Sequence, residues 1–178
     1  MQAAPFPLRY NVKPVPTSDP SQRGPLARIL LRVPVPWVFV LTYLAGAGLE
    51  IAFRRRGLIP GYEWLTPAGF VIFILGAGLA AWGWLIFRRA RTTRVPGESS
   101  TTLVTGGPYR FTRNPMYVGL AIAYLGEAAI QHQILPVVLL PLTLAYLNQV
   151  VIPVEEERLR AVFGAEYELY QSTVRRWL

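Results

Sequence analysis

The chain has 178 residues, of which 52% are hydrophobic and only 16% are charged, and its formal net charge is +8. Since an ordinary soluble domain carries roughly 25% charged residues, this composition argues against a soluble protein and favours a membrane protein. Cysteine is absent and His132 is the one histidine, which excludes disulfides, thiol nucleophiles and multi-histidine sites, so we predict no metal site.

Residues 1–33 are polar and proline-rich, and they lack the pattern of a cleaved signal peptide. We predict a cytoplasmic tail here, with a short interfacial segment at 26–33. The basic residues of the whole chain cluster beside apolar stretches, where anionic lipid headgroups are the nearest partner. We therefore expect membrane lipid, and no nucleic acid, to be the partner of this positive charge.

Four apolar stretches follow, and they predict an all-α polytopic membrane protein with about four transmembrane helices. The stretches at 34–53 and 65–87 each match the roughly 20 residues needed to cross the hydrocarbon core. Those at 115–130 and 134–154 are separated by a three-residue polar turn and predict a helical hairpin. Glycines are expected to allow close helix packing at five positions: Gly46, Gly48, Gly76, Gly78 and Gly83.

Positive charge predicts the orientation of these spans. Of the 18 basic residues, 15 lie in the tail, between the second and third spans, or after the fourth span. An even number of spans places all three regions on one side, which the positive-inside rule assigns to the cytoplasm. We therefore predict cytoplasmic termini and a location in the cell (inner) membrane. The three arginines at 54–56 are the exception and would face outward.

A first polar segment, at 106–119, precedes the third span and reads Gly-Gly-Pro-Tyr-Arg-Phe-Thr-Arg-Asn-Pro-Met-Tyr-Val-Gly. Its Gly-Gly-Pro start predicts an irregular loop. Asn114 is a natural N-cap and Pro115 a natural first helical residue. A loop followed by a capped helix is therefore a complete structural explanation of the segment.

The same segment also has a functional interpretation. A helix N-terminus offers unpaired amides and partial positive charge, and Arg110 and Arg113 lie beside this one, which predicts an anion site. Tyr109 and Tyr117 bring aromatic faces to the same end, so a ligand with a carboxylate and a flat ring would fit. Alternatively, the arginines anchor the chain to lipid phosphates.

A second polar segment follows the fourth span, which we expect Pro153 to end or kink. Its apolar residues recur at helical spacing and predict an amphipathic helix at the C-terminus, on the cytoplasmic side. Counting back along that face places Glu155 on the buried stripe, while Glu156 and Glu157 rotate away and complement the helix dipole. A buried Glu155 requires a cationic partner or a ligand. The stripe comprises Leu159, Phe163, Tyr167, Tyr170, Val174 and Trp177.

Together the two segments resemble the integral-membrane S-adenosylmethionine-dependent methyltransferases, the isoprenylcysteine carboxyl methyltransferase and phospholipid methyltransferase group. In that family a Gly-x-Tyr-x-x-x-Arg-His/Asn-Pro-x-Tyr-x-Gly segment precedes a helical hairpin, and a Glu-Glu-x-x-Leu-x-x-x-Phe-Gly-x-x-Tyr-x-x-Tyr segment follows it. These match 107–119 and 155–170, and the resemblance covers 103–178. Asn114 stands where eukaryotic-type members have His and cannot carry a proton near neutral pH, so the chain is more similar to the small prokaryotic branch.

The resemblance implies a methyltransferase that moves a methyl group from S-adenosylmethionine to a lipophilic or small acceptor by in-line displacement, leaving S-adenosylhomocysteine. It implies a cofactor-binding region at 88–178, after two transmembrane helices at 34–87. The implied catalytic residues are Arg113, Asn114, Tyr117 and Glu155. The implied cofactor-binding residues are Gly107, Tyr109, Arg110, Arg113, Asn114, Pro115, Met116, Tyr117, Gly119, Glu155, Glu156 and Tyr167.

Two other functions remain open at this level. Membrane sterol reductases have a similar C-terminal tract of aromatic and basic residues and bind NADPH, although their bodies contain many more spans. The third possibility is a non-catalytic membrane scaffold that keeps the motif for folding. Binding of S-adenosylhomocysteine or of NADPH would distinguish the three.

Polar residues within the spans have competing explanations. Glu127, in the third span, is either a base on the acceptor side or a structural partner of Gln131. Glu50 lies one helical turn from Arg54, and we predict an ion pair between them. His132 lies in the hairpin turn, far from both polar segments, and is not a predicted site residue.

Overall fold

A computed structural model of the protein describes residues 34–53, 63–90 and 102–178. Throughout these residues the secondary structure is helical, with no strand. The predicted fold class, an all-α polytopic membrane protein, is confirmed. The tail at 1–33, the arginines at 54–56 and the basic residues at 91 and 94 lie outside the described residues. The orientation in the membrane therefore stays a prediction.

The helices reproduce the predicted apolar stretches closely. They are α2 (Val35–Ala52), α3 (Leu65–Ala90), α4 (Pro115–Ile130) and α5 (Leu135–Tyr146), with α5 extended by further helix to Phe163. Among the described residues, α2, α3 and the helix from Leu135 to Phe163 are long and apolar enough to cross a membrane. Since α4 has only 16 residues, the third predicted span, at 115–130, stays a prediction.

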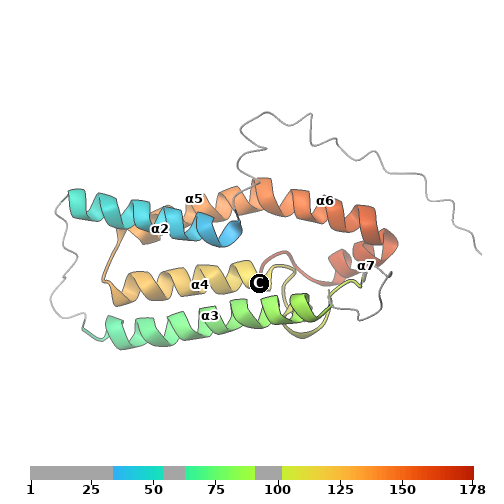
Figure 1. The fold of residues 1–178 in the computed structure, drawn as a ribbon, viewed down its shortest axis with the longest axis horizontal. Coiled ribbons are helices and arrows are strands. Elements are labelled where there is room, and N and C mark those ends of the chain that lie inside the picture. The colour runs from blue at the N-terminus through green and yellow to red at the C-terminus, as the bar shows by residue number, and fades with distance from the viewer. Residues whose placement is uncertain (1–33, 54–62, 91–101) are drawn as a thin grey trace, which may run out of the picture.

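The helices form two pairs, α2 with α5 and α3 with α4 (Figure 1). Helices α4 and α5 follow one another through a short turn, as the predicted hairpin requires. Each of them, however, packs mainly against a helix from the first half of the chain rather than against the other. The hairpin is therefore a connection that joins two helix pairs.

Glycines explain why α3 and α4 lie so close. A Cβ atom added to Gly76 would overlap the backbone of Ala123, and one added to Gly119 would overlap the backbone of Ala80. Small residues at such a contact let two backbones approach and gain van der Waals contact, which drives helix association in lipid. Gly119, an implied cofactor-binding residue, therefore lies in the helix interface.

The predicted packing glycines divide into two groups. Gly46, Gly76 and Gly83 face neighbouring helices, as expected. The prediction is wrong for Gly48 and Gly78, which have no other described atom within 4 Å of an added Cβ. Each follows a packing glycine by two residues, and two helical steps of about 100° turn it to the opposite face of its helix.

Glu50 accepts hydrogen bonds at the start of α5. Its side chain is 5% exposed, and its carboxylate accepts the backbone N–H groups of Ile134 and Leu135 at 3.0 Å. Arg54 lies outside the described residues, so the ion pair between Glu50 and Arg54 stays a prediction. Glu50 supplies negative charge at the N-terminal end of α5, where the helix has unpaired amides. Nearby, Glu127 accepts a hydrogen bond from Gln131 at 3.1 Å, one of its two predicted roles.

Pro153 does not end the fourth span, which contradicts one of the two predicted alternatives, and a kink at this residue stays a prediction. The five-residue π-helical turn η3 (Leu147–Val151) connects α5 to α6 (Ile152–Phe163), which contains Pro153 at its second position. A wider turn of this kind accommodates the missing N–H and the ring of a proline without ending the helix. The chain therefore stays helical past the predicted boundary at 154.

The C-terminal region contains two short helices in place of the single predicted one. Gly164, with φ of +52°, ends α6, and α7 (Ala165–Thr173) then turns back toward the start of α4 (Figure 1). Positive φ favours glycine, which explains the break at this position. Five members of the predicted stripe still pack in one cluster with Leu103, whereas Trp177 packs against the core formed by α2, α4 and α5.

Candidate active site

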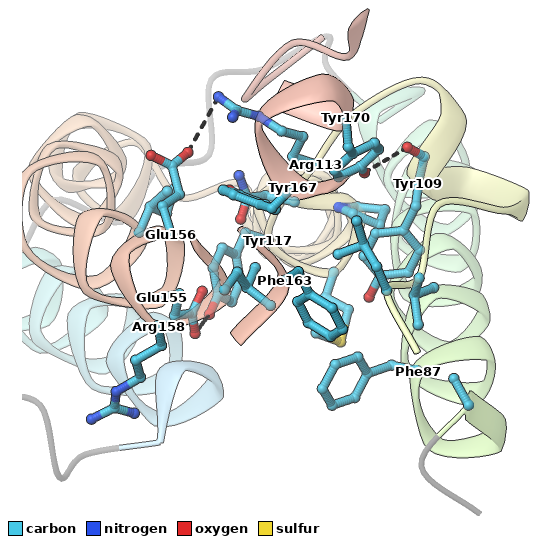
Figure 2. Close-up of a pocket in the computed structure, with 18 of the residues that line it drawn as sticks. Phe87, Tyr109, Arg113, Tyr117, Glu155, Glu156, Arg158, Phe163, Tyr167 and Tyr170 are labelled. Atoms are coloured by element: carbon cyan, nitrogen blue, oxygen red, sulfur yellow. Dashed lines mark hydrogen bonds and ion pairs between the residues drawn. The ribbon is translucent and has the colours of Figure 1, made fainter. Parts of the chain in front are cut away.

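A cavity of about 480 Å³ lies between the end of α3, the segment before α4, and helices α6 and α7. The 3-10 turn η2 (Gly107–Arg110) and the start of α4 supply one wall, and α6 and α7 supply the other. Both polar segments of the sequence therefore contribute to one cavity (Figure 2). We call it the donor cavity.

Arg113 is the principal cation of this cavity. Its side chain is only 10% exposed, and its Nη2 lies 3.2 Å from Glu156 Oε1. Its Nε and Nη1 atoms are buried and have no hydrogen-bond partner among the described residues. A buried donor without a partner is costly, so this guanidinium is suited to receive an anionic ligand.

Glu156 does not rotate away from the buried face as the sequence predicted. It is 6% exposed and more buried than Glu155, and it accepts hydrogen bonds from Arg176 Nε at 3.0 Å and Nη2 at 2.6 Å. The count along an ideal helix failed because the partners of Glu156 come from loops that helical periodicity does not describe. Both glutamates consequently line the cavity.

Glu155 is held by Tyr117. The Tyr117 hydroxyl donates a hydrogen bond of 2.6 Å to Glu155 Oε1, linking α4 to α6 (Figure 2). The predicted need of this carboxylate for a partner is met by a neutral donor rather than a paired arginine. A charge-assisted bond to one oxygen leaves the other oxygen available to a ligand.

Asn114 begins α4 without capping it through its side chain. Its Nδ2 donates to the Arg176 carbonyl at 2.9 Å, and the Arg113 backbone N–H donates to the Arg175 carbonyl at 2.9 Å. The predicted side-chain cap, in which Asn114 Oδ1 would accept an N–H of the first turn, is therefore wrong, and the side chain binds the returning C-terminus through Nδ2. The amides of Arg113 and Asn114 are both hydrogen-bonded already, which leaves the Arg113 side chain as the main anion-binding group.

Aromatic side chains form the rest of the cavity wall. Tyr167 is 1% exposed, and the Tyr170 hydroxyl donates to the Tyr109 carbonyl at 2.7 Å. Burial, and to a smaller extent the charge of Glu155, raises the pKa of Tyr109 to about 12. This hydroxyl consequently stays protonated at neutral pH. Phe87 and Phe163 complete an apolar region at the opposite end (Figure 2).

A second cavity, of about 560 Å³, lies beside the first, between the starts of α2 and α4, the second half of α3, and α6. Its lining is mainly apolar and includes Ala80, Trp84 and Val154. The two cavities share four lining residues: Met116, Tyr117, Glu155 and Arg158. The Tyr117–Glu155 hydrogen bond therefore lies where the two cavities meet.

The structure brings most of the implied site residues together. Tyr109, Arg113, Asn114, Pro115, Met116, Tyr117, Glu155, Glu156 and Tyr167 line the donor cavity. Gly107, Arg110 and Gly119 do not line it. Gly107 has φ of +61° and packs against Ile86, Arg110 is exposed, and Gly119 contacts α3. Within the part of the chain that the structure describes, no group of three His, Cys, Asp or Glu side chains is placed to hold a metal ion.

Sequence reasoning did not assign roles to three residues that shape the site. Tyr170 belongs to the second motif, so its place in the motif was an available signal. Arg176 and Asn148 had no such signal, because the Arg176 Nη1 bond of 3.1 Å to Asn148 Oδ1 forms only when the chain returns to the membrane helices.

Comparisons with known proteins match more than half of the chain. The sequence profile of the phospholipid methyltransferase family matches residues 64–166. The chain is 32% identical to the cobalt-zinc-cadmium resistance protein CzcN of Cupriavidus metallidurans, over 74% of this chain and 57% of that protein. It is also 32% identical to the probable protein-S-isoprenylcysteine O-methyltransferases of Oryza sativa subsp. indica and subsp. japonica, over 64% of this chain and 60% of each. The chain thus spans about three fifths of the length of these relatives. No solved structure matches it.

Proposed function

This chain belongs to the phospholipid methyltransferase family, and we propose that it is an integral membrane methyltransferase that uses S-adenosylmethionine. The methyl donor would bind in the donor cavity, and a lipophilic or small acceptor would approach from the second cavity. The observation that carries the proposal is the buried Arg113 guanidinium, whose Nε and Nη1 atoms have no partner among the described residues.

The residues of the donor cavity fit this donor. Its carboxylate requires a cation, which Arg113 supplies, and its flat adenine requires an apolar and aromatic surface, which Phe87, Phe163 and Tyr167 supply. Its ammonium or ribose hydroxyls require an acceptor, which Glu155 would supply through Oε2, since its bond to Tyr117 uses Oε1. The volume, about 480 Å³, lies within the usual range for pockets that hold small molecules.

The chemistry required of the protein is mainly positioning. When bound, S-adenosylmethionine supplies a methyl group on a sulfonium, and S-adenosylhomocysteine remains after the methyl group has bonded to a nucleophilic atom of the acceptor. Holding two reactants in line removes much of the entropic barrier. Tyr117 and Glu155, which line both cavities, are placed to orient the reacting groups. The neutral amide of Asn114 donates to a backbone carbonyl, so Asn114 would orient the Arg113 segment without transferring a proton.

The second cavity supports the proposal of a lipophilic methyl acceptor. Its apolar lining between α2 and α3 suits a hydrocarbon chain, and Arg158 lies at its junction with the donor cavity. An acceptor with an apolar tail could therefore keep that tail among the helices while its reactive group reaches Tyr117. The acceptor group itself, whether a carboxylate, an amine or a thiol, is to be identified by experiment.

Ligand-dependent stability tests the proposal. The purified protein in detergent is heated with S-adenosylhomocysteine, with NADPH, or alone. A ligand that binds only the folded state at 100 times its Kd stabilises it by about 2.7 kcal/mol, so S-adenosylhomocysteine should raise the unfolding temperature. A rise with NADPH and none with S-adenosylhomocysteine would favour a reductase and refute the proposal.

A transfer assay then identifies the acceptor. The protein is incubated with S-adenosylmethionine carrying a labelled methyl group and with lipid amines, prenyl-cysteine acids or small thiols in separate reactions. Label should appear in one acceptor class, and the Tyr117→Phe variant should transfer less label to that acceptor. Binding of S-adenosylhomocysteine without label in any of these acceptors would exclude the three acceptor classes tested.

A further inference from the structure

The C-terminal strap, residues 174–178, brings Arg176 to the polar wall of the donor cavity. Arg176 binds both oxygens of Glu156, through Nε at 3.0 Å and Nη2 at 2.6 Å. Arg113 reaches the same carboxylate with Nη2 alone, at 3.2 Å from Oε1. Glu156 is thus shared unequally, and Arg176 is its principal partner.

Unequal sharing determines which of the two guanidinium groups keeps more of its positive charge. The cluster contains two guanidinium groups and one carboxylate, so it keeps one net positive charge. Because a bidentate arginine bond is stronger than a single contact, Arg176 holds Glu156 away from full pairing with Arg113. Arg113 consequently keeps two buried donors, Nε and Nη1, without partners among the described residues.

We propose that Arg176 is a positioning residue that tunes the donor cavity for an anionic ligand: by engaging both oxygens of Glu156, it leaves the Arg113 guanidinium free for the ligand's carboxylate. This inference rests on the proposed function, because that carboxylate belongs to the proposed methyl donor. Without Arg176, Glu156 would turn both oxygens to Arg113 and neutralise it.

The π-helical turn η3 supports Arg176 from the opposite side. Asn148 Oδ1 accepts hydrogen bonds from Arg176 Nη1 at 3.1 Å and from Trp177 Nε1 at 3.2 Å. The guanidinium is therefore held between Asn148 and Glu156, on one continuous helix. The strap also binds the Arg113 segment, because the Arg176 carbonyl accepts hydrogen bonds from Thr112 Oγ1 and Asn114 Nδ2.

The test compares two ligands that differ only in the carboxylate. S-adenosylhomocysteine and its decarboxylated analogue, which keeps the adenosine, the sulfur and the amine, are titrated into the unchanged protein and its variants in detergent. For the unchanged protein we expect affinity at least about tenfold higher for S-adenosylhomocysteine, the gain of one charge-assisted contact. We call the affinity for S-adenosylhomocysteine divided by the affinity for the analogue the ratio. For Arg176→Gln we expect this ratio to fall to about threefold or less, with affinity for the analogue changed by less than about twofold.

Three further variants exclude a merely structural role. Arg160→Gln removes the same charge from a residue that binds Gln171 and lines neither cavity, and should leave the ratio unchanged. Adding Glu156→Gln to Arg176→Gln removes the competing carboxylate and should restore the ratio. Arg176→Lys keeps the charge but cannot span both oxygens, so its ratio should be intermediate, which keeps the test informative if Arg176→Gln does not fold.

The outcomes separate the two proposals. If the unchanged protein binds S-adenosylhomocysteine but the Arg176 variants weaken both ligands equally, Arg176 only holds the fold and the inference is overturned. It is also overturned if the double variant fails to recover the ratio. Failure of the unchanged protein to bind S-adenosylhomocysteine would overturn the proposed function itself, and the inference with it.

Discussion

The α3–α4 interface and the donor cavity are both buried, but different forces hold them together. At the interface, backbone meets backbone because Gly76 and Gly119 have no side chains to separate the helices. In the cavity wall, Arg113, Glu156 and Arg176 form charged contacts between segments far apart in sequence. The comparison separates folding from ligand binding: a change in the first region should lower stability, and a change in the second should lower affinity.

The largest effect is expected from Gly76→Ala. The added Cβ would overlap the backbone of Ala123, which cannot move as a flexible side chain would, so we expect a loss of about 3 kcal/mol in the free energy of unfolding. The unfolding temperature in detergent measures it. Gly78→Ala, on the open face of the same helix, is the matched control and should change stability by less than about 0.5 kcal/mol. Equal losses in the free energy of unfolding for the two variants would show that the close packing of α3 and α4 does not stabilise the fold.

Arg113→Gln should have the opposite effect, with a large loss of ligand affinity and a small loss of stability. Loss of a charged donor pair should weaken S-adenosylhomocysteine binding about thirtyfold, which corresponds to about 2 kcal/mol. Stability should change less, since Glu156 keeps its bond to Arg176. Titration calorimetry measures the affinity. The exposed Arg110, which does not line the cavity, provides the comparison, and a similar loss in Arg110→Gln would contradict the placement of the ligand.

Glu155→Gln should reduce affinity for S-adenosylhomocysteine by about tenfold, because a neutral amide replaces a charged acceptor for the ligand's ammonium or hydroxyls. Glu157→Gln makes the same chemical change two residues away, outside both cavities, and should alter affinity by less than about twofold. Equal effects of the two replacements would exclude Glu155 as a ligand contact.

The smallest effect is expected from Asn148→Ala, because Asn148 contacts the strap through Arg176 and Trp177 and does not line the donor cavity. It removes the acceptor for Arg176 and Trp177, so the strap should loosen and stability should fall by about 1 kcal/mol. Affinity for S-adenosylhomocysteine should fall slightly as well, by about twofold. Gln149→Ala, at the neighbouring exposed position, is the control for both measurements. A pure stability loss would place Asn148 with the folding elements alone.

The sequence predicted most of the helices and the cavity residues, and its failures share a cause. Apolar length located α2, α3 and α4, and motif spacing identified Arg113, Tyr117 and Glu155, because these features are local. The predictions failed for Glu156 and for the side-chain cap of Asn114, and they missed the contact of Glu50 with the start of α5. Each of these polar groups has partners in another segment, which local periodicity does not reveal.

Composition and apolar periodicity by themselves determined an all-α membrane protein, because a backbone in lipid must satisfy its hydrogen bonds within each helix. The two motifs by themselves determined which residues are available for a site. Only the tertiary structure decided that Arg176 shares Glu156 with Arg113, because that contact requires Gly164 to reverse the chain and the strap to dock beside α4. The charge presented by the donor cavity is therefore a property of the folded chain, since it depends on groups that only folding brings together.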